Sequence, residues 1–184
     1  MVIDKLKNIY VFMFLVTLVS SVVLSTTYTQ LIAKINQNIE VDRKKNVLKS
    51  IGVNLDALDS ESIIDLYSNL ISEIVLDLDG NTTGLNISDL EMVENKSTGT
   101  TTYGHKGEQF LPLFLSESKN ATIFPISGKG LWSTMFGYIA LKDDLNSVLG
   151  ITFYKHGETP GLGAEVEKKW FQENFIDKRI FDEN

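Results

Sequence analysis

The stretch FLPLFLSESKNATIFPISGKGLWSTMFGYIALKDDLNSVLGITF, residues 110–153, decides the fold. It contains short runs rich in apolar, aromatic and β-branched side chains, which are typical of strands. These runs cover residues 110–115, 121–126, 135–141 and 148–153. Polar or glycine-containing turns separate them, at residues 116–118, 128–130 and 143–144. The pattern predicts a mostly antiparallel sheet.

The next ten residues, HGETPGLGAE at 156–165, predict a shaped loop that leads into a helix. Pro160 fixes its own φ, and Gly161 can adopt the positive φ of a type II turn, so the chain turns sharply here. Gly163 lets the backbone approach another group closely. From Ala164 the apolar spacing becomes helical, and this helix is expected to pack on one face of the sheet, giving an α+β layer architecture. Such a loop either presents backbone N–H groups to an anion or a flat heterocycle, or is only a strand-to-helix connection.

Two helices and a polar tract are expected before the sheet. Helical spacing continues up to a glycine stop at Gly52. A second helix is expected with Ser60 as its cap and an apolar series that reaches Ile74. Residues 77–103 are rich in Gly, Asn and Thr, which favours loops and a short hairpin.

The N-terminal region predicts one membrane-spanning helix. No charged residue lies between Lys7 and Lys34, and an apolar run of roughly 20 residues suffices to cross a bilayer. A cleaved signal peptide is the alternative, but the run is long for that role and has no clear Ala-x-Ala site. We therefore expect a span at residues 9–31 after a short cytoplasmic tail, residues 1–8, with the large C-terminal part outside.

Small polar residues recur every fourth position in this span, at Thr17, Ser21, Ser25 and Thr29. A stripe of this kind can pack against another membrane helix through close approach and interhelical hydrogen bonds. The hydroxyl groups can equally well bond to their own helix backbone. The sequence leaves both interpretations open.

Charge and cysteine content exclude several functions. Residues 1–50 carry seven Lys or Arg against three acids, whereas residues 51–184 carry ten against twenty-one. An acidic soluble part argues against nucleic-acid binding, and the basic collar after the span can contact lipid headgroups or solvent. With no cysteine in the chain, it cannot ligate an iron–sulfur cluster or attach a c-type haem.

A second loop, GKGLWST at residues 128–134, lies between two predicted strands. Its glycines and its Leu-Trp pair can lay an aromatic face against a ligand, although a Trp in a hairpin can also serve packing alone. Together with the following strand, GKGLWSTMFGY at 128–138 and GITFYKHGETPGLG at 150–163 resemble the C subunit of the bacterial sodium-translocating NADH:quinone oxidoreductase. The G subunit of the Rnf complex shares the Glu-Thr-Pro-Gly-Leu-Gly loop, residues 158–163, but lacks Gly-Leu-Trp-Ser-Thr-Met, so it is the second choice.

The resemblance implies a flavin site. The predicted FMN-binding residues are Trp132, Ser133, Glu158, Thr159, Gly161, Leu162 and Gly163. In the family, FMN phosphate is esterified to a threonine in a Ser-Gly-Ala-Thr motif, and this motif is absent from the chain. We therefore expect a truncated chain without the covalent FMN acceptor.

The resemblance also implies the organisation and role of the chain. A helical neck, residues 32–76, would join the span to an incomplete FMN-binding domain, residues 77–184. The domain would be periplasmic on the bacterial inner membrane and pass electrons toward quinone within a sodium-pumping complex, with the other subunits as partners. We expect no catalytic acid or base and no metal site, since His105 and His156 are isolated histidines. A membrane-anchored sensor or binding domain, or a purely structural subunit, is the alternative.

Overall fold

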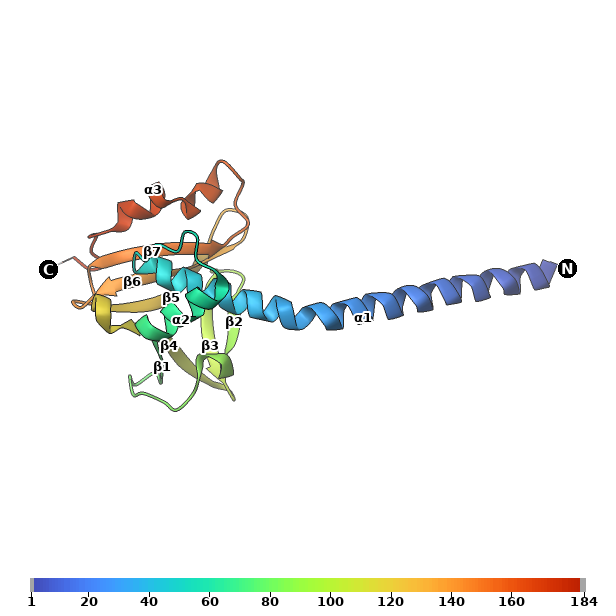
Figure 1. Ribbon diagram of the computed structural model, residues 1–184, viewed down its shortest axis with the longest axis horizontal. Helices are drawn as coiled ribbons and strands as arrows, with labels where there is room; N and C mark the ends of the chain where they lie inside the picture. The colour runs from blue at the N-terminus through green and yellow to red at the C-terminus, as the bar shows by residue number, and fades with distance from the viewer. Residues whose placement is uncertain (1, 183–184) are drawn as a thin grey trace. The chain divides into compact units, whose positions relative to one another are not determined.

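The computed structural model describes residues 2–182, with side chains described from residue 8 onward. The chain divides into two compact units, Met1–Val41 and Asp42–Asn184. The helices and strands in chain order are α1 (Val2–Ser50), α2 (Ser60–Leu70), β1 (Ser72–Leu76), η1 (Ile87–Asp89), β2 (Glu91–Asn95), β3 (Thr100–His105), β4 (Glu108–Ser116), η2 (Glu117–Lys119), β5 (Ala121–Lys129), β6 (Thr134–Lys142), β7 (Val148–Lys155), η3 (Gly163–Glu167), α3 (Lys169–Gln172) and η4 (Glu173–Phe175), where η marks a 3-10 helix. Figure 1 shows this order from blue to red.

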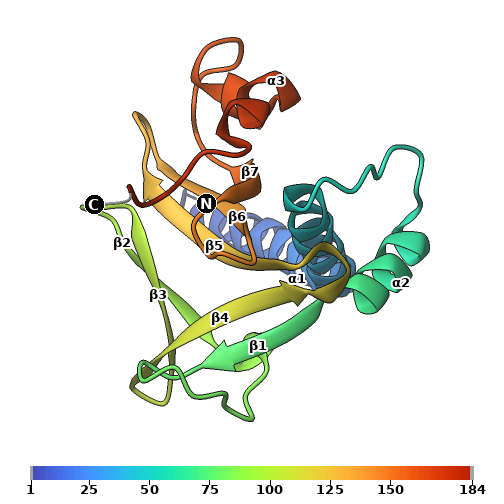
Figure 2. The ribbon, with the colours of Figure 1, turned by 90° about the vertical axis from the view of Figure 1, so that its left-hand side faces the viewer.

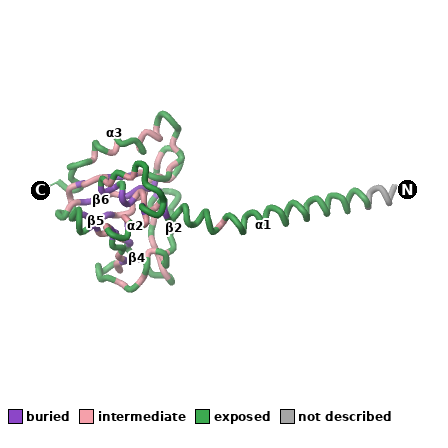
Figure 3. The backbone as a smooth tube through the Cα atoms, in the orientation of Figure 1, coloured by how far each residue is buried: buried purple, intermediate pink, exposed green. Residues whose placement is uncertain are grey.

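The first unit consists of helix α1 up to Val41, and it contains the predicted span. The helix is long and apolar enough to cross a membrane, and its residues are almost all exposed from residue 8 to residue 40 (Figure 3). Thr17 donates its hydroxyl to the carbonyls of Met13 and Phe14, at 3.0 and 2.9 Å. Thr29 donates to Ser25 at 2.8 Å. These bonds within the helix show that at least part of the hydroxyl stripe is satisfied by its own backbone.

Helix α1 ends as the glycine stop predicts. Gly52 has φ +77°, and its N–H donates to Lys49 at 2.9 Å while Val53 N–H donates to Leu48 at 3.2 Å. This pair of bonds is a Schellman cap, which needs a left-handed residue that glycine adopts without steric cost. The last turns of α1 belong to the second unit, where the side chains of Val47 and Leu48 are fully buried.

The core of the second unit is an antiparallel sheet, as predicted. Its strand order is β2-β3-β4-β5-β6-β7, and β1 pairs with β4 outside this path. Strand β6 lies in the middle of the best-paired part, with β5 on one side and β7 on the other (Figure 2). The polar tract supplies the expected hairpin, β2–β3. The four strands predicted within residues 110–153 are all present as β4 to β7.

The second helix differs from its prediction at both ends. The N-cap is Asp59, whose Oδ1 accepts the N–H of Ser62 at 2.9 Å, so Ser60 is the first helical residue. The helix ends at Leu70, and Ile74 lies in strand β1 opposite Leu113 of β4. The helical spacing therefore predicted a helix that is too long at its C-terminal end, because pairing with a distant strand overrides local periodicity.

The two faces of the sheet carry different elements. The last turns of α1 cover one face, where Thr152 donates its hydroxyl to the Asn46 carbonyl at 3.2 Å. Phe153 points to the opposite face, because successive strand residues alternate. There its ring lies 6.5 Å from the ring of Phe171 in α3. The C-terminal segment therefore packs on one face of the sheet, as expected.

That C-terminal segment is not the single helix predicted from Ala164. It is a 3-10 helix, η3, then the four-residue α3, then η4. Lys168 breaks the series with an extended backbone, φ −78° and ψ 142°. The sequence has no proline or glycine at this point, so spacing alone could not reveal the break.

Aromatic rings form a layer beneath the last turns of α1, within the second unit. The rings of Tyr138 and Tyr154 stack with centroids 5.2 Å apart, and Phe114 meets Tyr138 edge-on at 5.6 Å. Burial raises the pKa of Tyr138 far above its usual range, and burial together with the nearby Tyr154 raises the pKa of Tyr103 to about 12. Tyr103 and Tyr138 therefore stay neutral at physiological pH.

The β6–β7 turn gives a pH-dependent prediction. Asp144 Oδ1 accepts the N–H groups of Asn146 and Ser147, and Oδ2 accepts the Ser147 hydroxyl at 2.5 Å. The Ser147 bonds, with that of Asn146, lower the Asp144 pKa from 3.8 to about 2. A lowered pKa stabilises the fold above the unfolded value, and this contribution disappears as pH falls from about 4 to about 2.

We expect Asp144→Ala to unfold at a lower temperature than the wild type at pH 7, with the difference closing as pH approaches 2. Thermal unfolding followed by circular dichroism across this range checks it. Asp143→Ala, at the exposed neighbouring position, is the control. A gap that stays constant with pH would contradict the assignment.

Candidate functional site

Two loops meet at one end of strands β6 and β7. The tryptophan loop, residues 128–134, joins β5 to β6, and Gly130 N–H closes its turn by donating to the Ser133 carbonyl at 2.9 Å. The proline loop, residues 156–163, follows β7 directly. Because Phe136 of β6 pairs with Lys155 of β7, the antiparallel register places both loops at the same edge.

The proline loop has the sharp turn that its sequence predicts. Gly161 has φ +74°, and Leu162 N–H donates to the Thr159 carbonyl at 3.1 Å. Ala164 N–H donates to the same carbonyl at 3.2 Å. A positive φ at the third turn position is the signature of a type II turn after proline. The prediction is confirmed.

Glu158 connects the two loops. Its Oε1 accepts the backbone N–H of Trp132 at 3.1 Å. Glycines enclose the carboxylate on both sides, because a Cβ on Gly130 would lie 2.4 Å from Oε1 and one on Gly163 would lie 2.9 Å from Oε2. A Cβ on Gly157 would lie 2.8 Å from Ser133 Oγ. The glycines therefore make room for a carboxylate that ties the loops together.

His156 holds the base of the proline loop. Its Nδ1 accepts the N–H of Glu158 at 3.2 Å. Its Nε2 lies 3.0 Å from Glu167 Oε1 in η3, at ion-pair distance but outside hydrogen-bond geometry, and only 7% of the imidazole side chain is exposed. A backbone N–H can only donate, so Nδ1 carries no proton and a neutral ring has its proton on Nε2, facing Glu167.

Apolar side chains project from both loops into solvent. Trp132 is 69% exposed and Leu162 is 73% exposed. A small cavity of about 230 Å³ lies at the base of the tryptophan loop, with Met135 and Phe153 in its lining. The exposed Trp132 ring and Leu162 side chain, next to glycine residues without side chains, suit a flat, partly apolar ligand.

The β2–β3 hairpin packs against the tryptophan loop. Thr134 donates its hydroxyl to the carboxylate of Glu94 in β2. Lys129 Nζ donates to the Ser97 carbonyl at 3.3 Å. Gly99 lies so close to the Lys129 backbone that a Cβ would come within 2.4 Å of its nitrogen. The predicted hairpin thus also contacts and stabilises the tryptophan loop.

The predicted site residues are brought together to different degrees. Ser133 and Glu158 lie at the contact between the loops, and Gly163 packs directly on Glu158. Trp132 joins this contact by its backbone, while its ring and Leu162 face solvent. The remaining predicted residues, Thr159 and Gly161, form the turn.

Sequence reasoning missed four contributors to this arrangement. They are Gly130, His156, Gly157 and Glu167. In the sequence His156 is an isolated histidine, and nothing there indicates that its side chain is buried. Its i,i+2 spacing to Glu158 was the available signal, but a contact with Glu167 across a turn has no sequence pattern.

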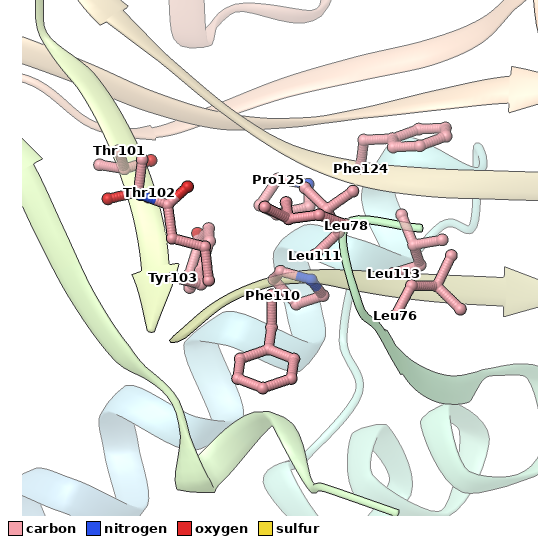
Figure 4. A pocket seen from close by; sticks show the side chains of 12 residues that line it. Leu76, Leu78, Thr101, Thr102, Tyr103, Phe110, Leu111, Leu113, Phe124 and Pro125 are labelled. Carbon is pink, nitrogen blue, oxygen red and sulfur yellow. The ribbon is translucent and has the colours of Figure 1, made fainter. Parts of the chain in front are cut away.

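A larger cavity, about 360 Å³, lies away from the two loops. It opens where β3, β4 and β5 diverge, and its lining includes Tyr103, Phe110, Leu113 and Pro125 (Figure 4). No residue of the tryptophan loop or the proline loop lines it. The candidate site is therefore the meeting point of the loops, where the predicted residues gather.

Comparison with known proteins points to the same segment. An FMN-binding domain family matches residues 130–183, which include most of the tryptophan loop and the whole proline loop. The C subunit of the Na(+)-translocating NADH-quinone reductase from Vibrio anguillarum is 29% identical over 98% of this chain and 75% of its own length. The corresponding C subunit from Pseudomonas aeruginosa is also 29% identical, over 91% of this chain and 70% of its own length.

A solved structure is similar as well. It is the crystal structure of the Na(+)-translocating NADH-quinone reductase C subunit from Parabacteroides distasonis, with a TM-score of 0.63 and 28% identity. The match covers 82% of this chain and 71% of the other. This structure therefore shares the fold of the chain.

Proposed function

We infer that this chain, which belongs to the C-subunit family of the Na(+)-translocating NADH-quinone reductases, is an FMN-carrying electron-transfer subunit. The observation that carries this function is the Glu158 bridge, which brings the tryptophan loop and the proline loop into contact. The segment that matches the FMN-binding domain family, residues 130–183, contains the whole proline loop and all but the first two residues of the tryptophan loop.

The residues of the site fit an isoalloxazine ring. We propose that the exposed Trp132 ring and Leu162 cover its apolar surface. Gly161 and Gly163 would let the backbone approach, while Ser133, Glu158 and Thr159 would meet the polar edge. A largely apolar pocket with few polar groups is what such a ligand requires.

FMN, when bound, supplies the redox chemistry by accepting and releasing electrons. The chain's own residues would hold and orient the ring and exclude water from it. They would also set its reduction potential, because a fixed carboxylate such as Glu158 disfavours added negative charge nearby. In this proposal the chain carries electrons within an oxidoreductase and needs no acid or base of its own.

The phosphate of FMN needs a separate attachment. Ser-Gly-Ala-Thr does not occur in residues 1–184, so we propose that these residues supply the ring cradle and that a threonine outside them supplies the covalent link. Without that covalent link, residues 1–184 would bind FMN reversibly.

The long apolar N-terminal helix indicates a membrane-anchored subunit. We propose that residues 9–31 span the inner membrane and that residues 77–184 face the periplasm; residues 32–76, the predicted neck, also contain α2 and strand β1 of the sheet. The relatives are subunits of a larger reductase, and we propose that the partners of this chain are the other subunits of such a complex.

FMN titration of the full chain in detergent micelles tests the proposed function. We expect saturable binding and quenching of flavin fluorescence by the Trp132 ring. Trp132→Phe should weaken this quenching, whereas Trp170→Phe, which removes the other of the two tryptophans, should leave it unchanged. Absence of saturable binding, or equal effects of the two variants, would overturn the proposed site.

A further inference from the structure

His156 is buried at the site but has no part in the proposed contacts with the flavin. It lies between Glu158, which bridges the loops, and Glu167 in η3. Resting on the proposed function, we propose that His156 is a positioning residue, which fixes the Glu158 carboxylate in the cradle through a single tautomer chosen by Glu167.

The first step is the bond at Nδ1. Glu158 N–H donates to it across 3.2 Å, so the backbone of Glu158 is tied to the ring two residues earlier. This bond fixes the position of the Glu158 backbone, from which its side chain extends. From there Oε1 reaches the Trp132 N–H at 3.1 Å, in the space left by Gly130 and Gly163.

The second step is the choice of tautomer. A neutral imidazole carries its proton on one nitrogen, and only the form with the proton on Nε2 leaves Nδ1 free to accept. The Glu167 carboxylate, 3.0 Å from Nε2, favours a proton at that nitrogen. Glu167 thus stabilises the tautomer in which Nδ1 can accept the Glu158 N–H. In histidines the partner at one ring nitrogen commonly determines whether the other nitrogen carries a proton.

Two substitutions of His156 separate positioning from simple packing. The side-chain oxygen of Asn can occupy the place of Nδ1, whereas the amide of Gln reaches only to the place of Nε2. We expect His156→Asn to keep the hydrogen bond to the Glu158 N–H and wild-type FMN binding. We expect His156→Gln to lose this bond and to bind FMN more weakly. Glu167→Ala should also lower the population of the Nε2-protonated tautomer.

The primary readouts use the FMN-free full chain in detergent micelles. Nitrogen-15 NMR of the imidazole should show the proton on Nε2. Hydrogen exchange of the Glu158 amide should accelerate about tenfold in His156→Gln, as expected for loss of one hydrogen bond, and stay near wild type in His156→Asn. FMN titration should then show weaker binding for His156→Gln only.

Each outcome decides the proposal. A ring protonated on Nδ1 would overturn it, as would equal exchange rates in the Asn and Gln variants. If neither variant folds, the tautomer in the wild type and in Glu167→Ala still decides the question. If the wild type does not bind FMN, the proposed function fails, while the tautomer and exchange results still test the role of His156.

Discussion

Gly150→Ala is expected to lower the stability of the sheet unit by about 1–3 kcal/mol, the usual cost of forcing extra volume into a packed core. A Cβ at Gly150 in β7 would lie 2.4 Å from the carbonyl oxygen of Ser50. Ser50 is the last residue of α1 and is fully buried, so this oxygen cannot simply turn into solvent. The end of α1 would have to move away from the sheet.

The measurement is urea or thermal unfolding of the full chain in detergent micelles, followed by circular dichroism. A loss of this size corresponds to a midpoint lower by about 2–4 °C per kcal/mol for a chain of this length. Gly84→Ala is the matched control, because nothing lies within 4 Å of its Cβ position. Equal midpoints for the two variants would show that α1 does not rest on β7 as described.

The strands were predictable because their signals are local. The runs that form β4 to β7 are rich in apolar and β-branched residues, and polar or glycine-containing turns bound them. The end of α1 was predictable for the same reason, since Gly52 supplies the left-handed cap within one turn of the helix. In each case the deciding residues are neighbours in the chain.

The errors arose where distant contacts decide the structure. Ile74 continues the helical spacing of α2, yet it pairs with Leu113 of β4, far along the chain. Lys168 interrupts the expected C-terminal helix without any helix-breaking residue nearby. Local periodicity contains no information about either feature.

The candidate site divides in the same way. The turn at Gly161 followed from its sequence, because proline and glycine have fixed conformational preferences. The Glu158 bridge to Trp132 joins residues 26 positions apart, and only the register of β6 against β7 brings them together. The resemblance predicted the residue types, and the fold shows their arrangement.

Gly130→Ala is expected to weaken FMN binding about ten- to a hundredfold, the range that corresponds to losing one hydrogen bond to a charged group. The new Cβ would lie only 2.4 Å from Glu158 Oε1, and it would also lie 2.8 Å from the Ser133 carbonyl oxygen. The carboxylate would have to leave the Trp132 N–H, because the loop backbone blocks the opposite direction. The two loops would then separate.

The matched control lies two residues earlier in the same loop. A Cβ at Gly128 meets nothing within 4 Å, so Gly128→Ala should bind FMN as the wild type does. FMN titration by flavin fluorescence, with unfolding midpoints measured alongside, separates loss of the cradle from loss of the fold. Glu158→Gln should fall between the two, because it keeps an oxygen acceptor for Trp132 but not the charge. If Gly130→Ala and Gly128→Ala bind FMN equally, the Glu158 bridge does not hold the flavin site together.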